Sequence, residues 1–187
     1  MTDREALLTD RAALLAVVRD KAVVRGAVTL SSGRQASWYI DLRRVLLDGR
    51  AAPLAGRVLL AATADLSFDA VGGLTLGADP VALAMLHAAA AGGSRVLDAF
   101  VVRKSVKEHG LQRRIEGPDV DGRLVLAVED TSTTGSSVLT AVDALAEAGA
   151  EVAGVAVLVE RGGRDAVTRR GLPYRAVFEL AELGLDS

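Results

Sequence analysis

Cysteine is absent from the 187 residues, which excludes disulfide bonds, thiolate metal sites, iron–sulfur clusters and cysteine nucleophiles. Histidine occurs only as His87 and His109, which leaves little room for a metal cage or a proton relay built on imidazole groups. The longest stretch without Asp, Glu, Lys or Arg covers residues 80–94 and is too short for a membrane span. Residues 1–5 lack the pattern of a signal peptide. From these absences we expect a cytoplasmic protein with no membrane partner.

An excess of charge of one sign is also missing, because 22 basic residues stand against 24 acidic residues and the net charge is −2. A chain with this balance lacks the broad basic face that grips nucleic acid, so we expect no nucleic-acid partner. Lysine is rare and occurs only as Lys21, Lys104 and Lys107, two of them in one segment. Half of the residues are hydrophobic, which is enough for a packed core, and the length fits a single domain.

Short apolar runs alternate with helical patterns along most of the chain. We predict a helix over 2–18, a hairpin over 26–44, further helices over 51–65, 79–91 and 135–148, and strands over 70–73, 96–102, 124–128 and 152–159, with a last strand at 177–178. Because the strands show no polar alternation, they indicate an α/β fold with a central, mostly parallel sheet flanked by helices on both faces. Ligands of such sheets bind at the carboxyl ends of the strands, so we expect the functional residues just after residues 73, 102, 128 and 159.

The strand at 124–128 leads into two acids and a run of hydroxyl residues. Glu129 and Asp130 come first, and residues 131–137 then read Thr-Ser-Thr-Thr-Gly-Ser-Ser before a helix. Hydroxyl groups and the free N–H groups of a helix start form a cradle for an anion. Adjacent acids accept hydrogen bonds from vicinal hydroxyls or hold a metal-bound water. The segment predicts a ribose-5-phosphate site, and a capped strand-to-helix turn is the simpler alternative.

Three further segments follow predicted strands. Between Arg103 and Glu116, five cations stand against two acids, and cations this close repel one another unless an anion such as a diphosphate leaving group joins them. Residues 72–80 form a Gly-rich turn whose N–H groups could meet a phosphate. Arg161 directly follows a buried strand, where a guanidinium can grip a planar carboxylate with two parallel hydrogen bonds. The alternatives are a solvated charged loop, an ordinary tight turn and a surface arginine.

Segment 124–137 resembles the motif with which type I phosphoribosyltransferases bind phosphoribosyl pyrophosphate (PRPP): an apolar run, two acids, small or hydroxyl residues, and a glycine. Arg-Lys-x-x-Lys-x-His-Gly at 103–110 resembles the catalytic loop of orotate phosphoribosyltransferases in particular. Residues 26–43, with Thr-Leu-Ser-Ser-Gly and then Tyr39, Asp41 and Arg43, resemble the N-terminal hood that covers the base in that family. The resemblance implies one type I phosphoribosyltransferase domain over residues 1–187, with a small hood (about 1–45), a core (46–187) and a mobile catalytic loop (about 103–117).

The same resemblance implies the reaction and its participants. The phosphoribosyl group of PRPP would pass to N1 of orotate, giving orotidine 5′-phosphate and diphosphate in the de novo synthesis of UMP. Mg²⁺ would be held mainly by PRPP and water, with no direct protein ligand. The protein would be a homodimer whose catalytic loop acts on the partner's site. Arg161 and the hood argue against the alternative of a purine or uracil phosphoribosyltransferase. The intact loop argues against a non-enzymatic PRPP-binding regulator or a nucleotide-binding module without turnover.

Residue roles are carried over position by position. The resemblance gives catalytic roles to Lys104, Lys107 and His109, with Lys107 as the main catalytic cation, and orotate contacts to Thr133 and Arg161. The implied PRPP contacts are Arg103, Lys104, Lys107, His109, Glu129, Asp130, Thr131, Ser132, Thr133, Thr134, Gly135, Ser136 and Ser137. Three features depart from the family pattern. Glu129 stands where many members have Asp, and Arg25 is the nearest cation where many members have Lys. Residues 111–115 are bulkier than the small-residue stretch of many family loops.

Overall fold

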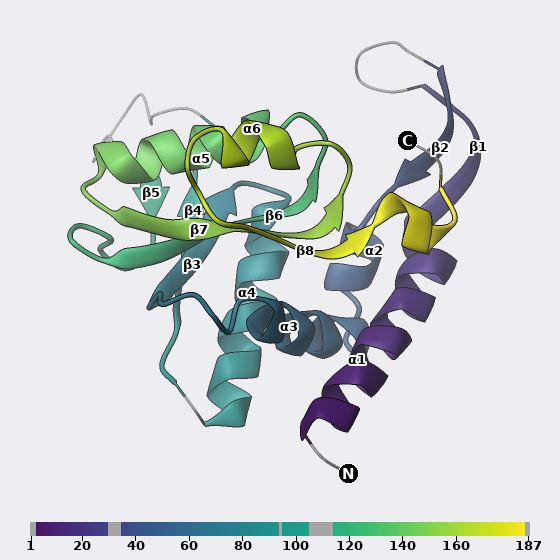
Figure 1. Ribbon diagram of the computed structural model, residues 1–187, viewed down its shortest axis with the longest axis horizontal. Coiled ribbons are helices and arrows are strands. Elements are labelled where there is room, and N and C mark those ends of the chain that lie inside the picture. The colour runs from purple at the N-terminus through teal and green to yellow at the C-terminus, as the bar shows by residue number, and fades with distance from the viewer. Residues whose placement is uncertain (1–2, 30–34, 94, 105–113, 186–187) are drawn as a thin grey trace.

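The structure is a computed structural model that describes residues 3–29, 35–93, 95–104 and 114–185 (Figure 1). Its N-terminal part begins with a long helix, continues into a two-stranded antiparallel hairpin and ends with two helices. These elements are α1 (Asp3–Val17), the π-helical turn η1 (Val18–Ala22), β1 (Val23–Thr29), β2 (Gln35–Ile40), α2 (Arg43–Leu46) and α3 (Ala51–Ala62). The hairpin and the helices of this part agree with the prediction, apart from the short α2, which was not expected.

A six-stranded sheet in the order β5-β4-β3-β6-β7-β8 forms the centre of the molecule. Its neighbouring strands are parallel, except that β5 pairs antiparallel with β4. The strands are β3 (Ala70–Leu74), β4 (Asp98–Val102), β5 (Ile115–Glu116), β6 (Leu124–Ser132), β7 (Glu151–Glu160) and β8 (Tyr174–Glu179). The predicted α/β fold with a mostly parallel sheet is therefore confirmed.

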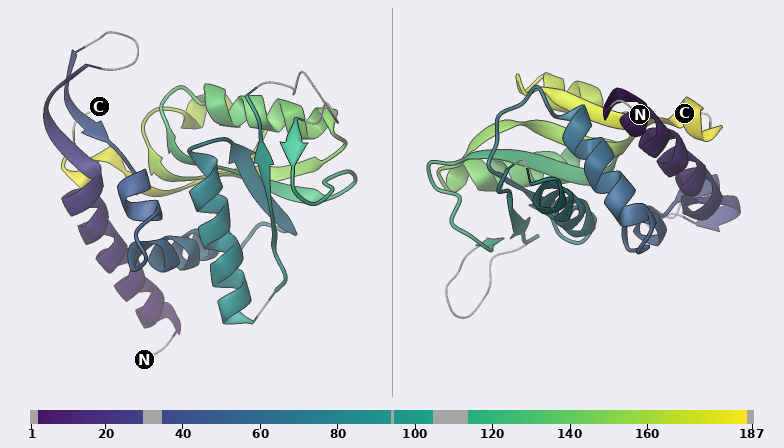
Figure 2. Two further views of the ribbon diagram at one scale, coloured as in Figure 1. Left: turned by 180° about the vertical axis from the view of Figure 1, so that it is seen from behind. Right: turned by 90° about the horizontal axis from the view of Figure 1, so that it is seen from below.

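Helices cover both faces of this sheet (Figures 1 and 2). On one face lie α1, α3 and α4 (Ala78–Gly92), and on the other lie α5 (Ser136–Glu147) and α6 (Arg164–Thr168). Along β6, Leu126 and Val128 belong to the apolar cluster under the first group, while Val125 and Ala127 belong to the cluster under α5. Both faces of the strand are buried, which explains why its sequence shows no polar alternation.

Three details differ from the sequence prediction. Strand β6 continues to Ser132, because it keeps pairing with β7 up to the pair Ser132↔Glu160. Glu129 and Asp130 therefore lie on the strand itself and not after it. The expected catalytic loop, at about 103–117, contains β5, and α6 follows β7; both elements are too short to give a periodic pattern.

Helix α1 and strand β1 are tied to the C-terminal part of the described chain, which includes the 3₁₀ turn η2 (Leu180–Leu183). Arg11 on α1 donates from Nη2 to the carbonyl of Val177 (2.9 Å) and to the carboxylate of Glu182 (2.6 Å). Arg25 on β1 donates from Nη2 to the carbonyl of Gly184 (3.0 Å). Figure 1 shows η2 beside the hairpin. Arg25 thus has a structural partner at the far end of the sequence.

Chain connectivity reverses direction between β3 and β6. From β3 the chain passes through α4 to β4 on one side, and from β6 it passes through α5 to β7 on the other side. Ligands of open α/β sheets bind outside such a reversal point, at the carboxyl ends of the two strands. The strands approach closely there, since a Cβ on Gly73 would lie 2.2 Å from the carbonyl oxygen of Val128. Within the described residues, none of the helices has both the length and the apolar character of a membrane span.

Candidate active site

The connection between β6 and α5 surrounds a polar cavity of about 220 Å³, which is lined by residues 129–138. Gly135 has φ +77° at the start of α5, a conformation that favours glycine and turns the chain into the helix. The hydroxyl of Thr134 accepts a hydrogen bond from the Ser136 N–H (3.3 Å). The structure therefore brings the predicted residues Thr131 to Ser137 together around one cavity at a helix N-terminus, which is the arrangement an anion cradle requires.

Two carboxyl groups belong to the lining of this cavity. Glu129 is only 6% exposed, whereas Asp130 is half-buried and accepts a hydrogen bond from the Thr131 N–H at Oδ1 (2.6 Å). Burial, and then the negative charges of Asp130 and Asp79, raise the pKa of Glu129 to about 8. Without substrate, this side chain therefore holds a proton at neutral pH. Hydroxyl donors or a cation placed here would favour its charged form.

The loop between β3 and α4 packs directly against these acids. A Cβ on Gly77 would lie 2.5 Å from Oε1 of Glu129 and 3.0 Å from Oδ1 of Asp130. The Thr75 hydroxyl donates to Oδ2 of Asp79 (2.7 Å), while Oδ1 of Asp79 is buried with no hydrogen-bond partner among the described residues. The peptide bond between Thr75 and Leu76 is cis. The predicted Gly-rich turn thus lies directly beside the acid pair.

Arg161, the first residue after β7, lies next to the hood. Its guanidinium carbon is 4.9 Å from the centre of the Trp38 ring, and its Nε is buried with no hydrogen-bond partner among the described residues. Burial lowers the pKa of Arg161, and the nearby Tyr39 and Asp130 act in the opposite direction. The guanidinium remains charged, because an arginine pKa lies far above neutral pH. The backbone N–H of Arg161 donates to the carbonyl of Ser132 (2.9 Å), which joins this residue to the cavity loop.

The predicted catalytic segment is only partly described. Lys107 and His109 lie outside the described residues. Arg103 stands at the start of the segment, where its N–H donates to the carbonyl of Arg114 (2.8 Å) and its guanidinium lies 3.5 Å from Glu116. Lys104 is exposed. The backbone carbonyl of Val102, one residue earlier, accepts a hydrogen bond from the Thr75 N–H (2.8 Å), so the segment starts beside the β3–α4 loop.

Two further residues reach the site but were not among the predicted site residues. Arg43 pairs with Asp41 (2.8 Å between Nε and Oδ1), and the charges of Asp41, Tyr39 and Asp130 raise its pKa. Asp79 carries the unpartnered buried oxygen described above. The Asp-x-Arg pair was visible in the hood pattern, but only the folded chain brings it near Asp130.

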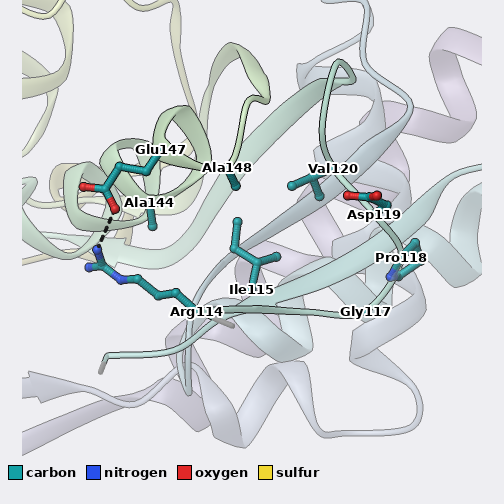
Figure 3. A pocket seen from close by; sticks show the side chains of 9 residues that line it. All are labelled: Arg114, Ile115, Gly117, Pro118, Asp119, Val120, Ala144, Glu147 and Ala148. Atoms are coloured by element: carbon teal, nitrogen blue, oxygen red, sulfur yellow. Dashed lines mark ion pairs between the residues drawn. The ribbon is translucent and has the colours of Figure 1, made fainter. Parts of the chain in front are cut away.

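A second cavity, of about 330 Å³, lies at the other end of α5 (Figure 3). It is lined from β5, the turn after it and the last residues of the helix, with Arg114 and Glu147 facing each other across it at 3.5 Å. A helix of 12 residues is about 18 Å long, so this cavity is separate from the anion cradle at the N-terminus of α5.

Among the described residues, no group of three or more His, Asp or Glu side chains is arranged to hold a metal ion. The carboxyl pair of Glu129 and Asp130 would still attract a cation that arrives with a substrate, because burial and the neighbouring negative charges make the charged form of Glu129 unfavourable until positive charge is added. The donor set therefore fits a hard cation such as Mg²⁺ that keeps its other ligands from substrate and water.

Comparisons with known proteins agree on one family. A family model described as "Phosphoribosyl transferase domain" matches residues 56–176. The orotate phosphoribosyltransferase of Streptomyces avermitilis is 66% identical over 179 residues, covering 94% of this chain and 98% of that protein. The Corynebacterium glutamicum enzyme of the same name is 57% identical over 178 residues, 94% of this chain and 95% of that protein. The crystal structure of Mycobacterium tuberculosis orotate phosphoribosyltransferase in complex with PRPP superposes with a TM-score of 0.82 at 52% identity, covering 94% of this chain and 99% of that chain.

Proposed function

The chain belongs to the orotate phosphoribosyltransferases, and on this basis we propose how its residues hold the two substrates. The enzyme transfers the phosphoribosyl group of PRPP to N1 of orotate, which gives orotidine 5′-phosphate and diphosphate in pyrimidine biosynthesis. The C1–O bond to diphosphate breaks while the bond from N1 to C1 forms. We also assign the reaction to the cytoplasm, in keeping with the biosynthetic role of the relatives.

The 5′-phosphate binds in the cradle between β6 and α5. The cavity of about 220 Å³, the hydroxyl groups of residues 131–137 and the N-terminus of α5 support this assignment. Glu129 and Asp130 accept hydrogen bonds from the ribose hydroxyls. These hydrogen bonds favour the charged form of Glu129, so substrate binding relieves the unfavourable burial of that carboxyl group.

Glu129 and Asp130 would hold Mg²⁺ that arrives with PRPP, with most of its ligands coming from PRPP and water. When bound, it supplies positive charge that offsets the negative charge developing on the diphosphate. Arg103, Lys104, Lys107 and His109 supply further positive charge to the departing diphosphate, with Lys107 as the main catalytic cation. The start of this segment beside the β3–α4 loop supports the placement. Catalysis consists mainly of positioning and charge stabilisation, and the proton on N1 of orotate is released to solvent as the bond to C1 forms.

Orotate binds between the hood and Arg161, with Thr133 as a second contact. The observation that carries this assignment is the half-buried guanidinium of Arg161, whose Nε lacks a partner among the described residues and which lies over Trp38 beside the phosphate cradle. Orotate has a carboxylate that can pair with two parallel N–H groups of a guanidinium. Uracil, adenine and hypoxanthine have no carboxylate. Arg161 therefore selects the base.

The first test is the loss of orotate absorbance with Mg²⁺ and PRPP, with parallel reactions in which uracil, adenine or hypoxanthine replaces orotate. Turnover with orotate alone is expected. Arg161→Ala should lower kcat/KM for orotate by about 100-fold or more, because a buried carboxylate would lose its charged partner. The KM for PRPP should stay unchanged. An Arg161→Ala enzyme with normal orotate kinetics would rule out this assignment.

We further propose a homodimer in which the catalytic loop acts on the partner's site. This follows from the likeness of residues 103–110 to the family loop. Mixing Lys107→Ala with Arg161→Ala subunits tests it, because in a hybrid dimer with action in trans one site carries both native residues. Activity should then return on mixing. If mixed samples stay as inactive as the two parents, the loop acts within its own subunit.

A further inference from the structure

Besides Glu129 and Asp130, another carboxylate lies at this edge of the sheet and has no part in the proposed chemistry. Glu160 is the last residue of β7 and is 6% exposed. Its Oε2 accepts the hydrogen bond of the Tyr174 hydroxyl on β8. Its Oε1 accepts the N–H of Gly162 (2.5 Å) and of Arg164 (3.3 Å). A buried carboxylate is costly unless it is hydrogen-bonded, and here three donors meet that requirement.

In the loop after Glu160, each backbone N–H group of residues 161–164 donates a hydrogen bond. The N–H groups of Gly162 and Arg164 go to Glu160, while those of Arg161 (2.9 Å) and Gly163 (3.2 Å) go to the carbonyl of Ser132. A Cβ on Gly163 would lie 1.9 Å from the Ser132 hydroxyl, so the two loops are in tight contact. Four consecutive amides are thus held either by the Glu160 side chain or by the phosphate cradle.

Tyr174 acts as the fixed donor in this cluster. Burial, and then the carboxylate of Glu160, raise the pKa of Tyr174, so its hydroxyl keeps its proton and donates at any pH where the protein works. The guanidinium of Arg164 lies 5.0 Å from the centre of the Tyr174 ring and pairs with Glu179 at 2.5 Å. The Glu160 carboxylate is therefore held between β8 on one side and the Arg161 loop on the other.

We propose that Glu160 and Tyr174 are positioning residues that hold the backbone of Arg161 so that its guanidinium faces orotate. The inference rests on the proposed contact between Arg161 and orotate. A guanidinium can grip a carboxylate with two parallel bonds only in a narrow range of orientations, and a misplacement of about 1 Å can lower a rate on the order of 100-fold. The shared carbonyl of Ser132 also fixes the distance between this residue and the phosphate cradle.

Glu160→Gln and Tyr174→Phe test the proposal, since each removes a hydrogen bond of the cluster and nearly keeps the shape of the side chain. Each should raise the KM for orotate about tenfold, equivalent to 1.4 kcal/mol. The KM for PRPP should not change. Glu179→Gln is the matched control, because it alters a carboxylate that faces the same loop from outside, through Arg164, and it should leave both constants unchanged. If Glu160→Gln does not fold, Tyr174→Phe decides.

A double-mutant cycle separates positioning from general damage. If Glu160 acts through Arg161, Glu160→Gln should add nothing to the orotate KM of an Arg161→Ala enzyme. Additive effects, or equal rises in the KM for orotate and for PRPP, would overturn the positioning role and leave the orotate contact of Arg161 standing. An Arg161→Ala enzyme with an unchanged orotate KM would instead overturn that contact and this inference with it.

Discussion

The loops after β6 and β7 lie side by side at one edge of the sheet, yet they are built in different ways. Residues 129–138 are consecutive and line one cavity by themselves. Arg161, by contrast, depends on Trp38 from the hood, on Glu160 and Tyr174 from two strands, and on the carbonyl of Ser132. A phosphate can be held by the backbone amides and short hydroxyl side chains of one consecutive segment. A planar carboxylate is bound by one long side chain, here that of Arg161, whose orientation depends on the residues around it.

The largest effect is expected at Glu129, a buried carboxyl group beside the phosphate cradle, and it should appear in the free energy of unfolding. Its pKa is about 8 in the folded protein, against an ordinary value of 4.5, so the folded protein binds a proton that the unfolded chain releases. The free energy of unfolding should therefore fall as pH rises from about 4.5 to about 8, by at most about 1.4 kcal/mol per pH unit.

Glu129→Gln removes this dependence, because glutamine carries no charge. Melting temperatures of both proteins without substrate, measured from pH 5 to pH 8, check it. The variant should match the native protein near pH 5 and exceed it at pH 8. Parallel curves would mean that Glu129 is already ionised at neutral pH.

Gly77→Ala tests whether PRPP binding depends on the close contact between the backbone of the β3–α4 loop and the acids next to the phosphate cradle. The new Cβ would lie 2.5 Å from Oε1 of Glu129, so the carboxylate must move away from its position beside the ribose site. Since the atom it meets is the end of a side chain, the fold should survive. We expect kcat/KM for PRPP to fall on the order of 100-fold, by steady-state assay.

Gly49→Ala is the matched control for this change. Nothing lies within 4 Å of a Cβ at Gly49, and its φ is not positive. It should leave the kinetics unchanged. If the Gly77→Ala enzyme has the same kinetics as Gly49→Ala, the close contact between the β3–α4 loop and Glu129 is not needed for activity.

The smallest effect is expected at Trp38, on the orotate side. Its ring lies 4.9 Å from the Arg161 guanidinium, and a cation–π contact of this kind contributes about 1 kcal/mol. Trp38→Leu should raise the KM for orotate about fivefold, while Trp38→Phe, which keeps a ring, should raise it less. Equal values for the two variants would mean that the ring face contributes nothing beyond its volume.

The sequence allowed a correct prediction of the mostly parallel sheet, of its longer helices and of the turn that leads into α5, because each depends on consecutive residues. The apolar runs of β3, β6 and β7 indicate burial on both faces, and the hydroxyl run before α5 indicates a helix N-terminus. Glu160 and Tyr174 escaped prediction, since a lone acid and a lone tyrosine at strand positions carry no local signal. The roles of Lys107 and His109, and the division into a hood of residues 1–45 and a core, stay predictions.

The contacts of α1 and β1 with the C-terminal segment also bear on how the chain folds. Arg11 finds its partners 166 and 171 positions further along the sequence, at Val177 and Glu182, and Arg25 finds its partner 159 positions further along, at Gly184. Contacts between residues so far apart in the sequence close a very large loop, which costs chain entropy and slows folding. We therefore expect α1 and β1 to dock late, after the central sheet has formed.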